Sequence, residues 1–309
     1  MVKDLIRNGL DAVEEKLHRV VKTDVDVLDE ASHHIIGSGG KRFRPRLLFL
    51  SYLTAGGDDL DEVVPMAAAV ELVHTATLVH DDINDHSLTR RGKITVHARW
   101  GRTFALLTGD YLFTKVYEMM APYGARMNTI MAEATVLLVE GETLQAVAAK
   151  SGQIDRETYK KIISRKTASL FRAAAEMGSL VAGADEAVAG HLSEYAHNLG
   201  LAFQIVDDVL DIVGDPETMG KPVGADLPQG MGAVALHNGR KVHSGIAEVE
   251  ADPLQELMGR LRESGAVEVA RAEAEEMAQR ARKALYRVPP SPARDEMDRL
   301  IDQVVRREH

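Results

Sequence analysis

The chain has 309 residues, 45% of them hydrophobic, which is enough to enclose a large core. Its formal net charge at pH 7 is −10, which argues against a nucleic-acid-binding protein that relies on a broad basic surface. Without cysteine, the chain has neither a disulfide framework nor cysteine-based zinc or thiol chemistry. No apolar run is long enough to span a membrane, and the N-terminus does not resemble a signal peptide, so we expect a cytoplasmic protein.

Apolar residues recur at helical spacing along almost the whole chain, and no strand pattern of any length is present. In chain order, the predicted helices cover residues 5–20, 25–36, 46–53, 64–85, 103–120, 126–150, 155–181 and 187–213. Thr23 or Asp24 is expected to cap the second helix. An amphipathic helical tail follows from Pro253, with breaks at Gly265 and Pro289. These elements predict one all-α domain over residues 1–309, a large helical bundle around a central cavity.

A glycine-rich turn at residues 37–40 interrupts the helical pattern and leads into the basic run K-R-F-R-P, which begins at Lys41. Exposed backbone N–H groups in such a turn, together with Lys41 and Arg44, suit a phosphate group. Taken alone, this segment is equally consistent with a structural loop that carries solvated cations.

Two aspartate-rich motifs of the pattern D-D-x-x-D begin at Asp81 and Asp207, in different predicted helices. The first and last acid of each motif lie one helical turn apart on one face, where like charges repel. A cation would relieve this repulsion, and oxygen-only ligands suit Mg²⁺ held by carboxylates and substrate phosphates. A solvated acidic face is the alternative, but apolar residues flank both motifs. The candidate metal ligands are Asp81, Asp82, Asp85, Asp207, Asp208 and Asp211.

Several further polar residues lie near these acids in the sequence. His74 precedes the first motif by seven residues, so it lies on the same face two turns away, and we expect a substrate contact; a buried core histidine is the alternative. Arg90 and Arg91 follow the motif, and adjacent guanidinium groups can bind two different phosphates. Lys166 and its neighbour Thr167 interrupt an apolar helix face, and Gln204 belongs to the polar stripe of the second motif.

These motifs, in this order, resemble those of trans-isoprenyl diphosphate synthases, the polyprenyl synthetase family, over nearly the whole chain. The resemblance is carried by residues 39–45, the first aspartate-rich motif with Arg90-Arg91-Gly92 after it, Gly109-Asp110-Tyr111-Leu112, Lys166-Thr167, Phe203-Gln204 before the second motif, and Gly220-Lys221-Pro222. It implies a prenyltransferase that joins isopentenyl diphosphate to an allylic diphosphate.

The resemblance also implies roles for the site residues. Three Mg²⁺ ions would bridge the allylic diphosphate and the acids. Direct ligands would be Asp81, Asp85 and Asp207, with Asp82, Asp208 and Asp211 completing the shells directly or through water. Arg90, Lys166 and Lys221 would clamp the same diphosphate as it leaves, and Thr167 and Gln204 would direct oxygen dipoles toward the resulting carbocation. Isopentenyl diphosphate would bind Lys41, Arg44, His74 and Arg91, and the departing diphosphate would take the final proton.

The resemblance implies that product length depends on the residue five positions before the first aspartate. An aromatic side chain there limits growth of the prenyl chain. Here that residue is Ala76, followed by Thr77. Small side chains would leave room for an extended apolar chain, so we predict a product of about C25 or more. A shorter product, as in farnesyl or geranylgeranyl diphosphate synthases, is the alternative.

One position departs from the family pattern, because Met231 stands where a lysine is usual. The departure keeps open a non-catalytic subunit that partners an active synthase, although both aspartate-rich motifs are intact. A class I terpene cyclase would share the Mg²⁺ chemistry but would not need a second anion site at Lys41, Arg44 and Arg91. The resemblance further implies a homodimer whose lipid product brings at most transient membrane contact.

Overall fold

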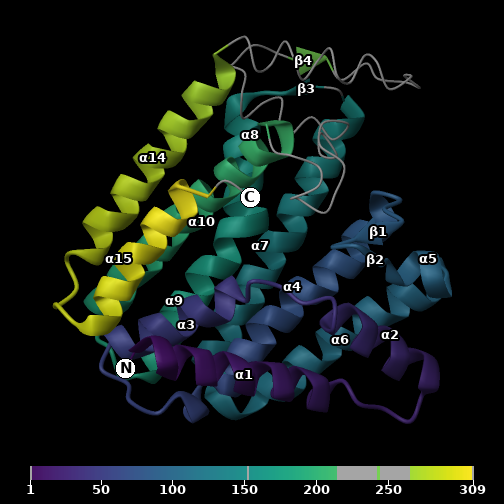
Figure 1. Ribbon diagram of the computed structural model, residues 1–309, viewed down its shortest axis with the longest axis horizontal. Coiled ribbons are helices and arrows are strands. Elements are labelled where there is room, and N and C mark those ends of the chain that lie inside the picture. The colour runs from purple at the N-terminus through teal and green to yellow at the C-terminus, as the bar shows by residue number, and fades with distance from the viewer. Residues whose placement is uncertain (1, 152, 214–241, 244–264, 308–309) are drawn as a thin grey trace. The chain divides into compact units, whose positions relative to one another are not determined.

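A computed structural model describes residues 2–151, 153–213, 242–243 and 265–307 (Figure 1). Almost all of these residues are helical, so the predicted all-α class is confirmed. In the described part of the chain, strands are limited to two antiparallel pairs of two residues each. They are β1 (Thr89–Arg90) with β2 (Lys93–Ile94), and β3 (Gln153–Ile154) with β4 (Val242–His243).

The chain divides into two compact units. The first unit contains Met1–Ala132, Ala173–Gly190 and Ser291–Glu296; the second contains Glu133–Arg172, His191–Pro290 and Met297–His309. The single domain expected over residues 1–309 stays a prediction.

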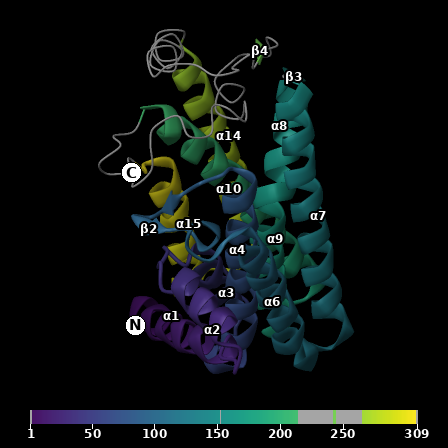
Figure 2. The ribbon, with the colours of Figure 1, turned by 90° about the vertical axis from the view of Figure 1, so that its right-hand side faces the viewer.

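The first unit is built around α4 (Val64–Asn84), a helix that is apolar on nearly all sides and therefore almost entirely buried. Pro65 lies in its first turn, where the missing N–H costs no helical hydrogen bond. Three helices, α1 (Val2–Val20), α3 (Phe43–Thr54) and α6 (Arg102–Met120), pack on α4, and α6 runs beside it in both views (Figures 1 and 2). This unit also contains α2 (Asp26–Ile36), a 3₁₀ turn (Leu60–Glu62) and α5 (Val96–Trp100).

Gly109 of α6 lies against the His80 imidazole of α4. A Cβ atom at this position would lie 2.2 Å from Nε2 of His80, which directly precedes the first aspartate-rich motif. Because real Cβ atoms do not tolerate such a distance, a side chain at this position would require the His80 imidazole or one of the two helices to shift.

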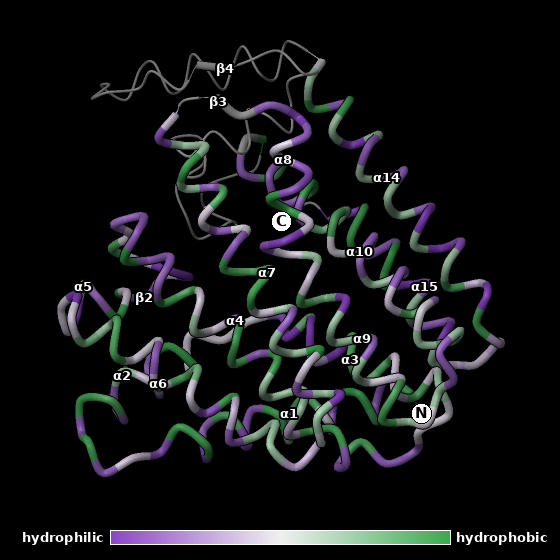
Figure 3. Tube along the Cα trace, turned by 180° about the vertical axis from the view of Figure 1, so that it is seen from behind, coloured by the Kyte–Doolittle hydropathy of each residue, from purple (hydrophilic) through white to green (hydrophobic). Residues whose placement is uncertain are grey.

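The second unit is likewise helical. Its helices, some with residues in both units, are α7 (Gly124–Ser151), α8 (Arg156–Ile163), α9 (Ser169–Val181), α10 (Glu186–Val213), α14 (Ala266–Leu285) and α15 (Pro292–Val305). A π-helical turn, Ser164–Ala168, joins α8 to α9. Gly200 of α10 contacts this turn, since a Cβ there would lie 2.9 Å from Cα of Ala168. The amphipathic tail is confirmed for α14, along which hydrophobic and hydrophilic positions alternate (Figure 3).

Three local expectations were wrong. The N-cap of α2 is Val25, without a side-chain cap, rather than Thr23 or Asp24. The third helix begins at Phe43 instead of at residue 46, because Pro45 lies in the first turn, where its missing N–H does not interrupt the helix. The short helix α5, which precedes Gly101, was not predicted.

Candidate functional site

The first aspartate-rich motif forms the C-terminal turn of α4. Asp81 and Asp85 lie one turn apart, with the N–H of Asp85 donating to the carbonyl of Asp81 at 2.8 Å. The intervening Asp82 is buried, and its Oδ1 accepts a hydrogen bond from Nε of Arg90 at 2.8 Å. Its Oδ2 is buried without a hydrogen-bond partner among the described residues. Burial raises the pKa of Asp82 above its ordinary value, while Arg90 opposes that rise.

His74, two turns earlier on α4, lies among arginine side chains. Burial lowers the pKa of His74 well below its ordinary value, and the positive charges of four arginines lower it further. These are Arg44, Arg91, Arg90 and Arg42. The imidazole is therefore neutral at physiological pH and presents one donor and one acceptor.

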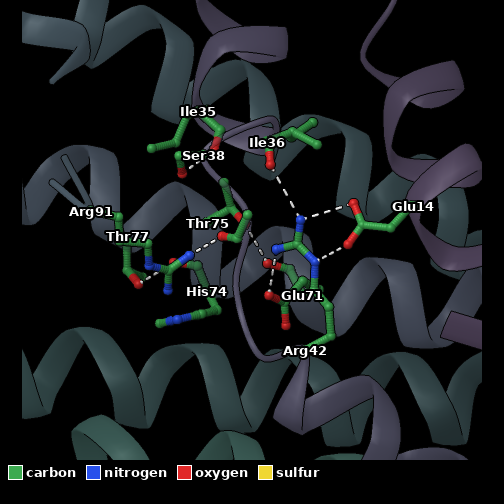
Figure 4. Close-up of polar contacts among 11 residues, drawn as sticks. Glu14, Ile35, Ile36, Ser38, Arg42, Glu71, His74, Thr75, Thr77 and Arg91 are labelled. Carbon is green, nitrogen blue, oxygen red and sulfur yellow. Dashed lines mark hydrogen bonds and ion pairs between the residues drawn. The ribbon is translucent and has the colours of Figure 1, made fainter. Parts of the chain in front are cut away.

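The hairpin formed by β1 and β2 holds the glycine-rich turn. The guanidinium of Arg91 donates to the carbonyl of Gly39, and Nζ of Lys93 donates to the carbonyl of Gly37 at 2.6 Å. Burial lowers the pKa of Arg91, and the neighbouring charge of Arg90 adds to this effect. The structure thus brings together the glycine-rich turn, Arg91 and His74, and Figure 4 shows Arg91 beside His74. Their shared role in binding isopentenyl diphosphate stays a prediction.

The residues expected to set product length, Ala76 and Thr77, are both buried in α4, at 0% and 5% exposure. The Thr77 hydroxyl donates to the carbonyl of His74 at 2.8 Å, so its polar group is satisfied within its own helix.

In the second unit, the acids of the second motif lie on α10. Asp208 accepts two hydrogen bonds, from the hydroxyl of Tyr159 at 2.6 Å and from Nε2 of Gln204 at 2.9 Å. The Oε1 atom of Gln204 in turn accepts from the hydroxyl of Thr167 at 2.7 Å. Thr167, Gln204 and Asp208, which the sequence singled out separately, therefore form one hydrogen-bonded series. Asp211 lies one turn after Asp207 and is buried.

Two residues in contact with these acids were not found from the sequence. Burial and the charge of Asp208 raise the pKa of Tyr159 well above 10, so its hydroxyl remains a donor. Nη1 of Arg307 donates to Oδ1 of Asp207 at 3.0 Å, and its guanidinium lies 5.3 Å from the centre of the Phe203 ring. Both residues are distant from the motif in sequence, so no local pattern could identify them.

Lys166 belongs to the π-helical turn, at partial exposure. Gly141 of α7 lies against its backbone, since a Cβ there would be 2.5 Å from the backbone nitrogen of Lys166. Lys221 and Met231 lie outside the described residues.

The chemistry of the acids fits a hard divalent cation, because they offer only carboxylate oxygens and Oδ2 of Asp82 has no hydrogen bond to another described residue. Within the described residues, no three His, Asp or Glu side chains are grouped closely enough to form a preassembled metal cluster. A search of the described helices found none with the length and hydrophobicity to cross a bilayer.

Comparison with known proteins identifies relatives over the full length. Residues 25–259 match the family model for polyprenyl synthetase. Octaprenyl diphosphate synthase of Escherichia coli K12 is 32% identical, covering 99% of this chain and 98% of that protein. A short-chain isoprenyl diphosphate synthase of Methanothermobacter thermautotrophicus is 34% identical, covering 100% and 99%. A polyprenyl synthase from Caulobacter crescentus CB15, solved with calcium and isoprenyl diphosphate, is 33% identical with a TM-score of 0.91, covering 100% and 97%.

Proposed function

Because this chain belongs to the polyprenyl synthetase family, we propose that it condenses isopentenyl diphosphate head-to-tail with an allylic diphosphate. One observation carries the proposal. A neutral His74 lies among arginines, and the carboxylates of the first aspartate-rich motif follow two turns later on the same helix. A single helix therefore presents an anion-binding group and a cation-binding group, as an enzyme with two diphosphate substrates requires.

Isopentenyl diphosphate is assigned to the arginine side of α4. Lys41, Arg44 and Arg91 supply positive charge to its phosphates, and the neutral imidazole of His74 can donate one hydrogen bond to them. The allylic diphosphate is assigned to Arg90, Lys166 and Lys221 together with the aspartates.

Mg²⁺ is the proposed cofactor, three ions being expected with the allylic diphosphate bound. Bound Mg²⁺ would offset the negative charge that develops on the leaving diphosphate. The proposed ligands are the six acids of the two motifs, Asp81, Asp82, Asp85, Asp207, Asp208 and Asp211. The Caulobacter relative was solved with calcium and isoprenyl diphosphate, which supports the binding of a divalent cation together with a diphosphate.

In the reaction, the C–O bond of the allylic substrate breaks and its electron pair leaves with diphosphate. The double bond of isopentenyl diphosphate then attacks the allylic cation, and the departing diphosphate accepts the proton lost from the product. The oxygen atoms of Thr167 and Gln204 are proposed to stabilise the cation, with Asp208 fixing the orientation of the Gln204 amide.

We assign a medium to long product, about C25 or more, because Ala76 and Thr77 are small. Overall similarity does not settle the length, since octaprenyl and short-chain synthases are nearly equally identical to this chain. The family also leads us to propose a homodimer. A non-catalytic partner subunit is the second candidate, favoured by Met231.

The test is incubation of the purified protein with Mg²⁺, labelled isopentenyl diphosphate and, separately, C5, C10, C15 and C20 allylic diphosphates. Elongated products that disappear in the Asp81→Ala variant support the synthase, and their length tests the Ala76 argument. A folded protein without turnover on any starter would overturn the proposal and favour the partner subunit.

A further inference from the structure

Arg42 differs from the basic residues on either side of it. Lys41 is exposed and Arg44 is partly buried, whereas Arg42 is buried, with 7% of its surface exposed. Its backbone adopts a left-handed conformation with φ of 44° and ψ of 43°, which is unfavourable for a residue with a side chain. Such a conformation persists only where surrounding contacts hold it in place.

Those contacts are ion pairs to two helices. Nε of Arg42 bonds to Oε1 of Glu14, and Nη2 bonds to Oε2 of the same carboxylate at 2.9 Å. Nη1 donates to Oε1 of Glu71 at 2.9 Å. Nη2 also donates to the carbonyl of Ile36, the last residue of α2, at 3.2 Å. Figure 4 shows the guanidinium between the carboxylates of Glu14 on α1 and Glu71 on α4.

The pairing with Glu71 places this cluster next to the proposed anion site. Glu71 lies one turn before His74 on α4, and its side chain is 5% exposed. Burial lowers the pKa of Arg91, itself a proposed ligand for isopentenyl diphosphate, and the charge of Glu71 partly opposes this lowering. Gly40 lies between the two arginines, because a Cβ there would be 2.8 Å from Nη1 of Arg91 and 3.3 Å from Nη1 of Arg42.

We propose that Arg42 is a positioning residue, which does not bind diphosphate itself but, through Glu14 and Glu71, fixes the segment that carries Lys41 and Arg44. This inference rests on the proposed function, because it assumes that Lys41 and Arg44 bind isopentenyl diphosphate. Arg42 is also the N-cap residue of α3, and its carbonyl accepts the helical hydrogen bond of Arg46 at 3.1 Å. The ion pairs thus fix the start of α3 and the positions of Lys41 and Arg44 on either side of Arg42.

A purely electrostatic role of Glu14 and a positioning role predict opposite effects of Glu14→Gln on the binding of isopentenyl diphosphate. Removing a carboxylate makes the region more positive, so Coulomb attraction alone predicts tighter binding of isopentenyl diphosphate. The positioning role predicts weaker binding, with a KM for isopentenyl diphosphate about tenfold higher and little change in the KM for the allylic diphosphate. Glu14 is the better target because its side chain is 38% exposed, so the variant is expected to fold.

The experiment measures both KM values and the melting temperature for wild type, Glu14→Gln, Glu71→Gln and Arg42→Lys. Glu15→Gln, an exposed change on the same helix, is the matched control and should retain both KM values. Arg42→Lys should retain only part of the affinity for isopentenyl diphosphate. One ammonium group cannot reproduce both the paired bonds to Glu14 and the bond to Glu71.

An unchanged or lower KM for isopentenyl diphosphate in Glu14→Gln would overturn the positioning role. Equal increases in both KM values would also overturn it, because they indicate a general structural effect. Absence of turnover in the wild type would instead refute the proposed function, so the two failures are distinguishable.

Discussion

Asp208 accepts hydrogen bonds from Tyr159 and Gln204, so its carboxylate is fixed by neighbours rather than free to rotate. Tyr159→Phe removes one donor and leaves a buried carboxylate oxygen less well satisfied. We expect the free energy of unfolding to fall by about 2 kcal/mol and kcat to fall about tenfold.

Tyr195→Phe provides the matched control for that prediction. Tyr195 is equally buried, and its hydroxyl donates to the carbonyl of Met297 at 2.9 Å. Its loss should lower stability by about 1 kcal/mol and leave kcat unchanged. A similar loss of kcat in both variants would show that Tyr159 acts only through stability.

His74 makes the free energy of unfolding depend on pH, and the direction of this dependence follows from its pKa. Its pKa in the folded state lies well below its ordinary value, so the unfolded chain binds the proton more tightly. Stability contributed by the neutral imidazole is therefore complete above about pH 6.5 and is lost as pH falls toward the folded-state pKa, by up to about 1.4 kcal/mol per pH unit.

Urea unfolding of wild type and His74→Gln at pH 7.5 and pH 5.5 tests this sign. The wild type should lose more free energy of unfolding than the variant on going to pH 5.5. Equal losses would mean that His74 is not the group responsible.

At the scale of elements, Gly109 of α6 lies against the His80 imidazole of α4. Gly109→Ala would place Cβ 2.2 Å from Nε2 of His80, so one helix or the imidazole must move. We expect the free energy of unfolding to fall by about 1–3 kcal/mol, measured by denaturant unfolding.

Gly190→Ala is the control for this change. Gly190 also lies within a helix, α10, but no atom lies within 4 Å of the Cβ position. The substitution should raise stability by about 0.5–1 kcal/mol. Destabilisation by both changes would argue against a steric role of Gly109.

Helix positions were largely predictable because apolar spacing and glycine or proline breaks are local signals. The predicted helix over residues 64–85 agrees with α4 (Val64–Asn84) to within one residue. The start of α3 was missed, although Pro45 in its first turn is a local signal. Its N-cap residue Arg42 has a left-handed backbone and bonds to Glu14 and Glu71, 28 and 29 residues away in the chain.

For the molecule as a whole, the proposal predicts that Mg²⁺ and diphosphate stabilise the fold jointly. A ligand that binds only the folded state raises the melting temperature, and at about 100 times its Kd it contributes about 2.7 kcal/mol. The increase should be largest when both are present, and it should be lost in Asp81→Ala and in Asp207→Ala. Chelation by EDTA should abolish it, and added Mg²⁺ should restore it.

Asp11→Asn is a suitable control, since Asp11 is exposed and lies outside all of the motifs. An undiminished shift in either motif variant would contradict the role of that motif. The metal-binding character of the two motifs could be predicted from the sequence, because it depends on residue types at a fixed spacing. The contacts that orient their side chains could not, because a partner such as Arg307 lies 100 residues from Asp207 in the chain.

The π-helical turn at Ser164–Ala168 has a consequence for insertions and deletions. A π-helical turn contains about one residue more than an α-helical turn, and each further residue rotates a helix by about 100°. Removing one residue between Tyr159 and Thr167 would convert this turn to α-helix and keep both side chains on one face, whereas inserting one would rotate them apart. Since Tyr159 contacts Asp208 and Thr167 contacts Gln204, both on α10, we expect the site to tolerate a one-residue deletion here better than a one-residue insertion.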